Sequence, residues 1–362
     1  MSWTGVRTIM VLELRQRVRA TRWRIMLGIW LAVLILLCGG LVITIETTSS
    51  GGVSNDYLLV LYDLVVCFVL GIGLIIAPTL SATSINGDRA DATLALLQAT
   101  ALRSQEIVVG KLLAAWVAAI AFLGVAVPFL VLLTVGGGSH WLAFLSHLVI
   151  LVFTLGAVCA IGLGFSALAA RPSASAVLTY LAVAALTVGT PLATLISTSL
   201  VTGTQTVESY YVDYDASTDD KVVCEPEPEI RTKVVTRTER IWWMLAPNPF
   251  VALGDATVHA PQQPASDTDG YPNSLLTRTG MGVDSMRKPQ PERVVYGYCK
   301  DLESSRNDSS SSRDDGGPLA EHLVFWPASL VVLMALGAGG VVMASRRLRV
   351  PAGKLPRGVR LA

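Results

Sequence analysis

Long apolar stretches separated by short polar ones dominate the first two hundred residues. A bilayer core needs about 20 apolar residues per helix. Six stretches of the chain meet or approach that length, and they are residues 25–45, 57–85, 107–135, 141–170, 174–201 and 323–344. Each therefore predicts one transmembrane helix. The first stretch follows several arginines, but it is too long for the apolar part of a cleavable signal and no A-x-A site follows it.

Composition leads to the same fold class. Apolar residues make up 52% of the chain and charged residues only 15%, which is far from the balance of a soluble domain. We predict an all-α polytopic membrane protein with six transmembrane helices. Residues 202–322 form a polar insertion between the fifth and sixth helices, and alternating runs around 230–238 and 293–298 predict strands in it. The insertion is thus expected to be α/β or β-containing.

The basic residues predict the orientation. Lys and Arg gather in residues 1–24, in the loop 81–111, in the turn at Arg171 and in the tail 345–362, whereas the loops 46–56 and 136–140 have none. Cytoplasmic loops carry the excess of Lys and Arg, so we expect both termini and the loop 81–111 in the cytoplasm. Residues 202–322 are then extracytoplasmic, and they are acidic, with 20 Asp and Glu against 12 Lys and Arg.

Residues 1–24 predict an amphipathic helix in the lipid headgroup layer. Trp3, Val6, Met10 and Leu14 share one face of a helical wheel, and Arg15, Arg19 and Arg22 share another. The alternative is that the arginines are only a topology signal.

The polar stretch 81–111 predicts a short amphipathic helix between two spans. Asp88 is expected to cap it, with Asp91 in its first turn, and Leu94 and Leu97 fall on one side. Ser104 is expected to cap the next helix. A short helix that presents leucines to the aqueous side can dock in a groove of a soluble partner.

This stretch resembles the corresponding loop of type-2 ABC exporter permeases, which reads as an acidic cluster followed by G-T-L-E-L-L, P-L-S, E-I and G-K-L. The departures are Ala92, Ala95 and Ala101 in place of glycine, glutamate and proline. A second segment, W-W-x-L-A-P-N-P-F from Trp242, resembles one that actinobacterial permeases of this family carry before their last span. The positions that match in the loop are Asp88, Asp91, Thr93, Leu94, Leu96, Leu97, Leu102, Glu106, Ile107, Gly110 and Lys111.

The resemblance implies a permease subunit that exports a substrate across the plasma (inner) membrane. In that family the loop is the coupling helix, which sits on a separate ATPase subunit that holds ATP and Mg. The implied partners are thus ABC ATPase subunits and a second permease copy or paralogue in the lipid bilayer, with no nucleic acid. The residues expected at the ATPase contact are Asp88, Arg89, Asp91, Thr93, Leu94, Leu97, Arg103 and Glu106.

Several residues outside the loop also have candidate roles. Asp63 lies in the second span, close enough to the outer end for water to reach it, so either a substrate-pathway role or a hydrated structural role is open. Gly156, Ala160 and Gly164 are spaced for close helix contact, which we expect within the bundle. Cys224 and Cys299 lie together in the insertion and predict a disulfide.

No catalytic site emerges from the sequence. The chain lacks a G-x-x-x-x-G-K-[ST] motif, so we expect no ATP site of its own, and His140 and His147 have no partners at metal-ligand spacing. We therefore expect neither an enzyme nor a bound cofactor or metal. The alternatives to the permease are a secondary transporter, or a membrane-anchored structural or sensory protein that acts through its external domain.

Overall fold

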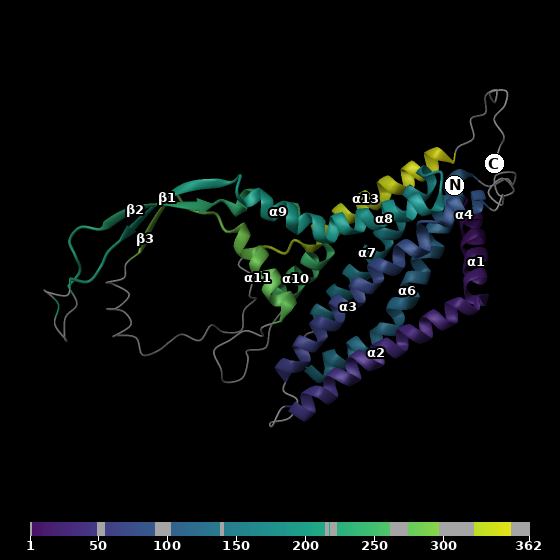
Figure 1. The fold of residues 1–362 in the computed structure, drawn as a ribbon, viewed down its shortest axis with the longest axis horizontal. Helices are drawn as coiled ribbons and strands as arrows, with labels where there is room; N and C mark the ends of the chain where they lie inside the picture. The colour runs from purple at the N-terminus through teal and green to yellow at the C-terminus, as the bar shows by residue number, and fades with distance from the viewer. Residues whose placement is uncertain are drawn as a thin grey trace.

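The structure, a computed structural model, describes residues 2–48, 55–90, 103–137, 141–213, 217, 223–260, 274–296 and 322–348. Six helices in this part of the chain are long and apolar enough to cross a membrane. Five are continuous, and they are α2 (Thr21–Thr48), α3 (Asn55–Ser81), α6 (Ser104–Gly137), α7 (Trp141–Leu168) and α13 (Trp326–Arg347). The six predicted segments are therefore confirmed as helices, and they lie side by side in one bundle (Figure 1).

The fifth of the six is built from α8 (Pro172–Ala184), the π-helical turn η1 (Ala185–Gly189) and α9 (Thr190–Thr198). The change of winding comes directly before Pro191, which has no N–H to offer the carbonyl of Thr187 four residues earlier. The side chain of Asn248 replaces that donor, because its Nδ2 lies 2.9 Å from the Thr187 oxygen. The Thr187 carbonyl that Pro191 leaves without a backbone donor thus receives its hydrogen bond from a distant part of the chain.

Helix α7 is the centre of the bundle. In the most apolar part of α7, 67% of the residues are buried, whereas the corresponding share is 6% in the α8–α9 helix and 17% in α2. It packs against α3, α6, α8 and α13. Most of the apolar surface of α2 and of the α8–α9 helix is therefore exposed in the described part of the chain.

Glycines make the contact between α7 and α13 unusually close. A Cβ atom on Gly340 would lie 2.6 Å from the carbonyl oxygen of Ala160, and one on Gly164 would lie 2.8 Å from the Cα of Gly340. Backbones can approach this closely only where side chains are missing or small. The prediction that the small residues of α7 pack within the bundle is confirmed.

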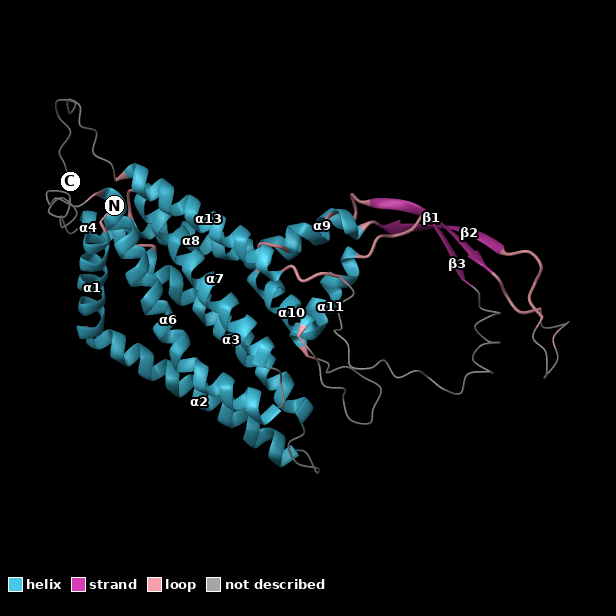
Figure 2. Ribbon diagram, turned by 180° about the vertical axis from the view of Figure 1, so that it is seen from behind, coloured by secondary structure: helices cyan, strands magenta, loops and turns pink. Residues whose placement is uncertain are grey.

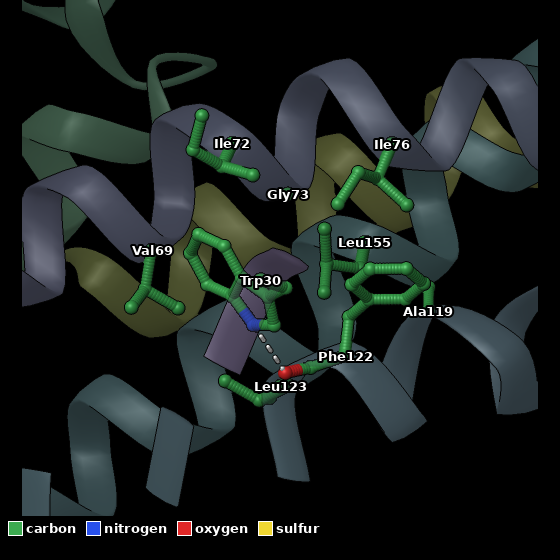
Figure 3. Close-up of a pocket in the computed structure, with 9 residues that line it drawn as sticks. All are labelled: Trp30, Val69, Ile72, Gly73, Ile76, Ala119, Phe122, Leu123 and Leu155. Atoms are coloured by element: carbon green, nitrogen blue, oxygen red, sulfur yellow. Dashed lines mark hydrogen bonds between the residues drawn. The ribbon is translucent and has the colours of Figure 1, made fainter. Parts of the chain in front are cut away.

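Helix α2 is held to the bundle through Trp30. Its indole Nε1 donates to the carbonyl oxygen of Phe122 in α6 at 3.0 Å, and its ring stacks on Phe68 of α3 with centroids 5.8 Å apart. Figure 3 shows this ring at an apolar pocket that Gly73 and Leu155 also line. The cavity of about 10 Å³ has room for no more than one water molecule, so the packing here is close to complete.

Residues 199–325, termed the insert, connect α9 to α13. They contain a sheet of three strands, β1 (Thr202–Ser209), β2 (Glu229–Thr236) and β3 (Arg293–Tyr296), in the order β2-β1-β3. β1 pairs with β2 in antiparallel and with β3 in parallel orientation. The strands predicted around 230–238 and 293–298 are confirmed. The sheet extends beyond the helices at one end of the molecule (Figure 2).

The insert also contains short helices that lie close to the bundle. They are η2 (Thr238–Arg240), η3 (Trp242–Leu245), α10 (Pro249–His259) and α11 (Leu275–Arg287). Asn248 caps α10, since its Oδ1 accepts the N–H of Phe250 at 2.9 Å. Pro247 and Pro249 interrupt the apolar run 241–258, and α10 is only 11 residues long, too short to span a bilayer. It packs against α7, α11 and α13.

Candidate functional site

A buried cation joins three helices, and the two shorter ones lie at the end of the bundle opposite the sheet (Figure 1). There α1 (Trp3–Arg19) and α4 (Ser84–Ala90) lie beside the start of α6. The side chain of Lys111 in α6 is only 1% exposed, and its ammonium pairs with the carboxylates of Glu13 in α1 and Asp88 in α4, the latter at 2.7 Å. An ammonium group is tolerated in such a place only when it is paired. Lys111 therefore fixes α1 and α4 to α6.

The first turn of α6 is fixed in the same way. The side chain of Glu106 accepts the N–H of Arg103 at 3.0 Å, which is the returning half of a capping box, and its other oxygen accepts the N–H of Ser2. Ser104 is the first residue of α6. The prediction that Ser104 caps this helix is thus wrong, because Arg103 precedes the helix and Glu106 supplies the capping oxygen.

Helix α4 is held on its other side by α7 and α8. Ser166 Oγ of α7 accepts the N–H groups of Ile85 and Asn86 at 3.0 and 3.2 Å. The Asn86 amide donates to Ser175 Oγ of α8 at 3.0 Å. The Ile85 side chain is completely buried, in a cluster that includes Val108 of α6 and apolar residues of α7 and α13. A helix of seven residues would not hold its position alone, but these contacts fix it to four helices.

Gly110 brings α1 into contact with α6. A Cβ atom at this position would lie 2.8 Å from Ile9 Cβ and 3.0 Å from the carbonyl oxygen of Val6. Val6 and Ile9 are buried, whereas Trp3 is 66% exposed. The predicted apolar face of Trp3, Val6, Met10 and Leu14 is therefore only partly the face that packs. The helix itself is confirmed, and it rests on α6.

A Gly110→Val substitution should detach α1. The added carbons meet the α1 backbone, so we expect a loss of about 1–3 kcal/mol, typical of overpacking, concentrated in the α1 contact. Amide hydrogen exchange over residues 3–19 should speed up. Gly124→Val is the matched control in the same helix, because nothing lies within 4 Å of its Cβ position. Equal exchange in the two variants would contradict this account of Gly110.

The site residues predicted from the sequence have different outcomes. Asp88, Arg103 and Glu106 belong to the cluster just described, and Arg89 lies beside it in α4. Asp88 lies within α4, and its carboxylate pairs with Lys111. The helix that Asp88 was predicted to cap lies outside the described residues, so that role stays a prediction. Four of the predicted contact residues, Asp91, Thr93, Leu94 and Leu97, lie outside the described residues.

Glu13, Asn86 and Ser166 were not among the residues predicted from the sequence. Glu13 gave one usable signal, since it is the only acidic residue among the arginines of residues 2–24. Asn86 and Ser166 gave none, because a polar residue in a loop and a serine in an apolar span are both common without any special contact.

Asp63 is not open to water, as the sequence had led us to expect. It is 5% exposed, and its carboxylate accepts hydrogen bonds from the Ser274 hydroxyl and the Leu276 backbone at the start of α11. The expectation failed because α11 covers this end of α3. Asp63 thus joins the insert to the bundle in this conformation, and the substrate-pathway role stays a prediction.

Other polar residues also have structural contacts. His147 is buried, with Nδ1 3.1 Å from the Tyr62 hydroxyl and Nε2 3.1 Å from Thr257 Oγ1. His140 and Cys299 lie outside the described residues, while Cys224 is disulfide-bonded. Within the described ranges, no group of three or more His, Cys, Asp or Glu side chains could hold a metal ion.

No protein-family model matches the chain, and a search of the curated proteins finds no match either. A proposal of function must therefore rest on the residues and their arrangement.

Proposed function

We propose that this chain is a permease subunit of an ATP-driven ABC transporter, which exports a substrate with energy from a separate ATPase subunit. One observation carries the proposal. Asp88, Glu106 and Lys111, three positions of the loop that resembles a coupling helix, take part in the polar contacts that tie α1, α4 and α6 together. A loop that transmits force needs both of its ends fixed to the spans, and these contacts supply that.

The arrangement supports a simple mechanism. Closure of the ATPase subunits around ATP would push on residues 91–102, which follow α4 and precede α6. Because Lys111 joins α4, α6 and α1, and Ser166 joins α4 to α7, the push would tilt these helices together. The bundle would act as a two-state element that nucleotide biases.

Topology and partners follow from the same proposal. The basic ends of α1 and α13 lie at the end of the bundle that holds α4 (Figure 1), which we assign to the cytoplasm by the excess of Lys and Arg. The sheet then lies outside the plasma membrane. A second permease copy or paralogue would cover part of the apolar surface that α2 and α8–α9 leave exposed.

Co-purification with ATP hydrolysis as the readout tests the proposal. The detergent-solubilised protein, expressed with its genomic neighbours, should retain an ATPase subunit, and a Leu94→Asp, Leu97→Asp double variant should lose it. Ile230→Asp is the control, since Ile230 is 63% exposed on the distant strand β2. Failure of any ATPase to associate with the wild type would favour a secondary transporter or a membrane-anchored external domain instead.

A further inference from the structure

The chain that enters the last transmembrane helix is held by side chains of α10 and α11. Residues 322–326, termed the strap, lead into α13. Asp255 of α10 accepts the N–H groups of Phe325 and Trp326 on Oδ2 at 2.9 and 2.8 Å. A carboxylate at this place also suits the positive end of the α13 dipole. The N–H groups at the start of α13 are thus capped by a side chain of α10 and not by a side chain of the strap.

Helix α11 holds the other half of the strap. The Asp284 carboxylate lies 3.0 Å from His322 Nδ1, and Arg287 donates to the carbonyl oxygen of Leu323 at 2.7 Å. The Arg287 guanidinium also lies over the rings of Trp242 and Phe325, at 4.9 and 5.5 Å from their centroids. These contacts seat the strap on both helices.

His259 of α10 also contacts the strap, and both of its ring nitrogens face hydrogen-bond acceptors. Its Nδ1 lies 2.8 Å from the carbonyl oxygen of Asp255 and 3.2 Å from Asp255 Oδ1, and its Nε2 lies 2.7 Å from the carbonyl oxygen of His322. A neutral imidazole has one N–H, so either tautomer would turn a nitrogen lone pair against an oxygen lone pair. Only the imidazolium, with two N–H groups, can donate to both sides.

We propose that protonated His259 is a pH-sensitive latch that holds the strap, and with it the start of the last span, against α10. The latch is complete at acidic pH. As the pH rises and the ring loses its proton, one of the two donors is lost and the strap is released.

Several other titratable and charged groups surround His259. On α10 itself, Asp255 faces the ring, while His322 faces it from the strap and Asp284 and Arg287 lie behind His322 on α11. Burial raises the pKa of the Asp255 carboxyl, although the N–H groups of Phe325 and Trp326 oppose that shift. His322 is the one other histidine of this cluster, and it must be separated from His259 by experiment.

The latch is independent of what the protein transports, so the test needs no ATPase. The full chain in detergent is compared at pH 6 and pH 8 by amide hydrogen exchange of Phe325 and Trp326, corrected for the intrinsic rate. Protection in wild type should fall about tenfold at the higher pH, as expected for the loss of one charge-assisted hydrogen bond. His259→Gln should show low protection at both pH values, and His322→Gln should keep the wild-type response.

Three results would overturn the latch. One is wild-type protection that does not change between the two pH values. A second is a pH response that survives in His259→Gln, and a third is a response that disappears in His322→Gln, which would assign it to His322. If His259→Gln does not fold, His322→Gln still decides the question by the direction of its response. Protection that falls as the pH rises supports the latch, because ionisation of the Asp255 carboxyl would instead strengthen its bonds to Phe325 and Trp326. Protection that no longer falls in His322→Gln overturns it.

Discussion

Replacing Lys111 by methionine should lower the stability of the bundle by about 3 kcal/mol, the cost of breaking a buried ion pair from one side. Methionine fills the space of the 1% exposed lysine side chain but leaves the Glu13 and Asp88 carboxylates facing each other without a cation. These keep 18% and 24% exposure, so water relieves part of the repulsion and the low end of the range applies. Thermal unfolding in detergent measures the loss.

A triple variant separates charge from packing. Glu13→Gln and Asp88→Asn in the Lys111→Met background remove all three charges while keeping similar shapes. Neutral replacements of a whole buried network often restore stability, so we expect most of the lost stability to return. A triple variant no more stable than Lys111→Met would mean that the lysine matters for its shape and contacts and not for its charge.

A Gly340→Leu substitution should separate α13 from α7. The Cβ atom alone would lie 2.6 Å from the Ala160 carbonyl oxygen and 3.2 Å from the Ile161 Cα, and backbone atoms cannot move aside as a flexible side chain can. Overpacking costs about 1–3 kcal/mol and sometimes more, and here we expect the upper end. The melting temperature in detergent and the yield of folded protein should both fall.

Gly339 provides the matched control for this interface. It is the neighbouring residue of α13, and nothing lies within 4 Å of its Cβ position. Gly339→Leu should therefore leave the melting temperature close to that of the wild type. If both leucine variants melt at the same temperature, the α7–α13 contact is looser in solution than the structure has it.

The transmembrane segments could be predicted because lipid imposes a simple rule of length and apolarity. Nothing comparable marks β1, which reads TGTQTVES and has one large apolar residue, Val207. It became a strand through pairing with β2 and β3, a long-range contact that no local pattern announces. The burial of Asp63 escaped prediction for the same reason, since the helix that covers it lies some two hundred residues further on.

The candidate site was predicted in part. Asp88, Glu106 and Lys111 drew attention by their place in the loop, but their partners could not be inferred. The ion pair of Asp88 could not be predicted, because the sequence does not show that Lys111 is buried and therefore needs a carboxylate beside it.

The contact between α7 and α13 also has a consequence for how the protein is made. The two helices lie far apart in sequence, with the fifth span and the whole insert between them. At about 5–20 residues per second on the ribosome, α13 is synthesised on the order of ten seconds or more after α7. The surface of α7 around Gly164 has no contact with α13 until then. During that interval α7, the most buried helix of the finished bundle, lacks its contact with α13. The core therefore finishes packing late in biosynthesis, after the insert has been synthesised.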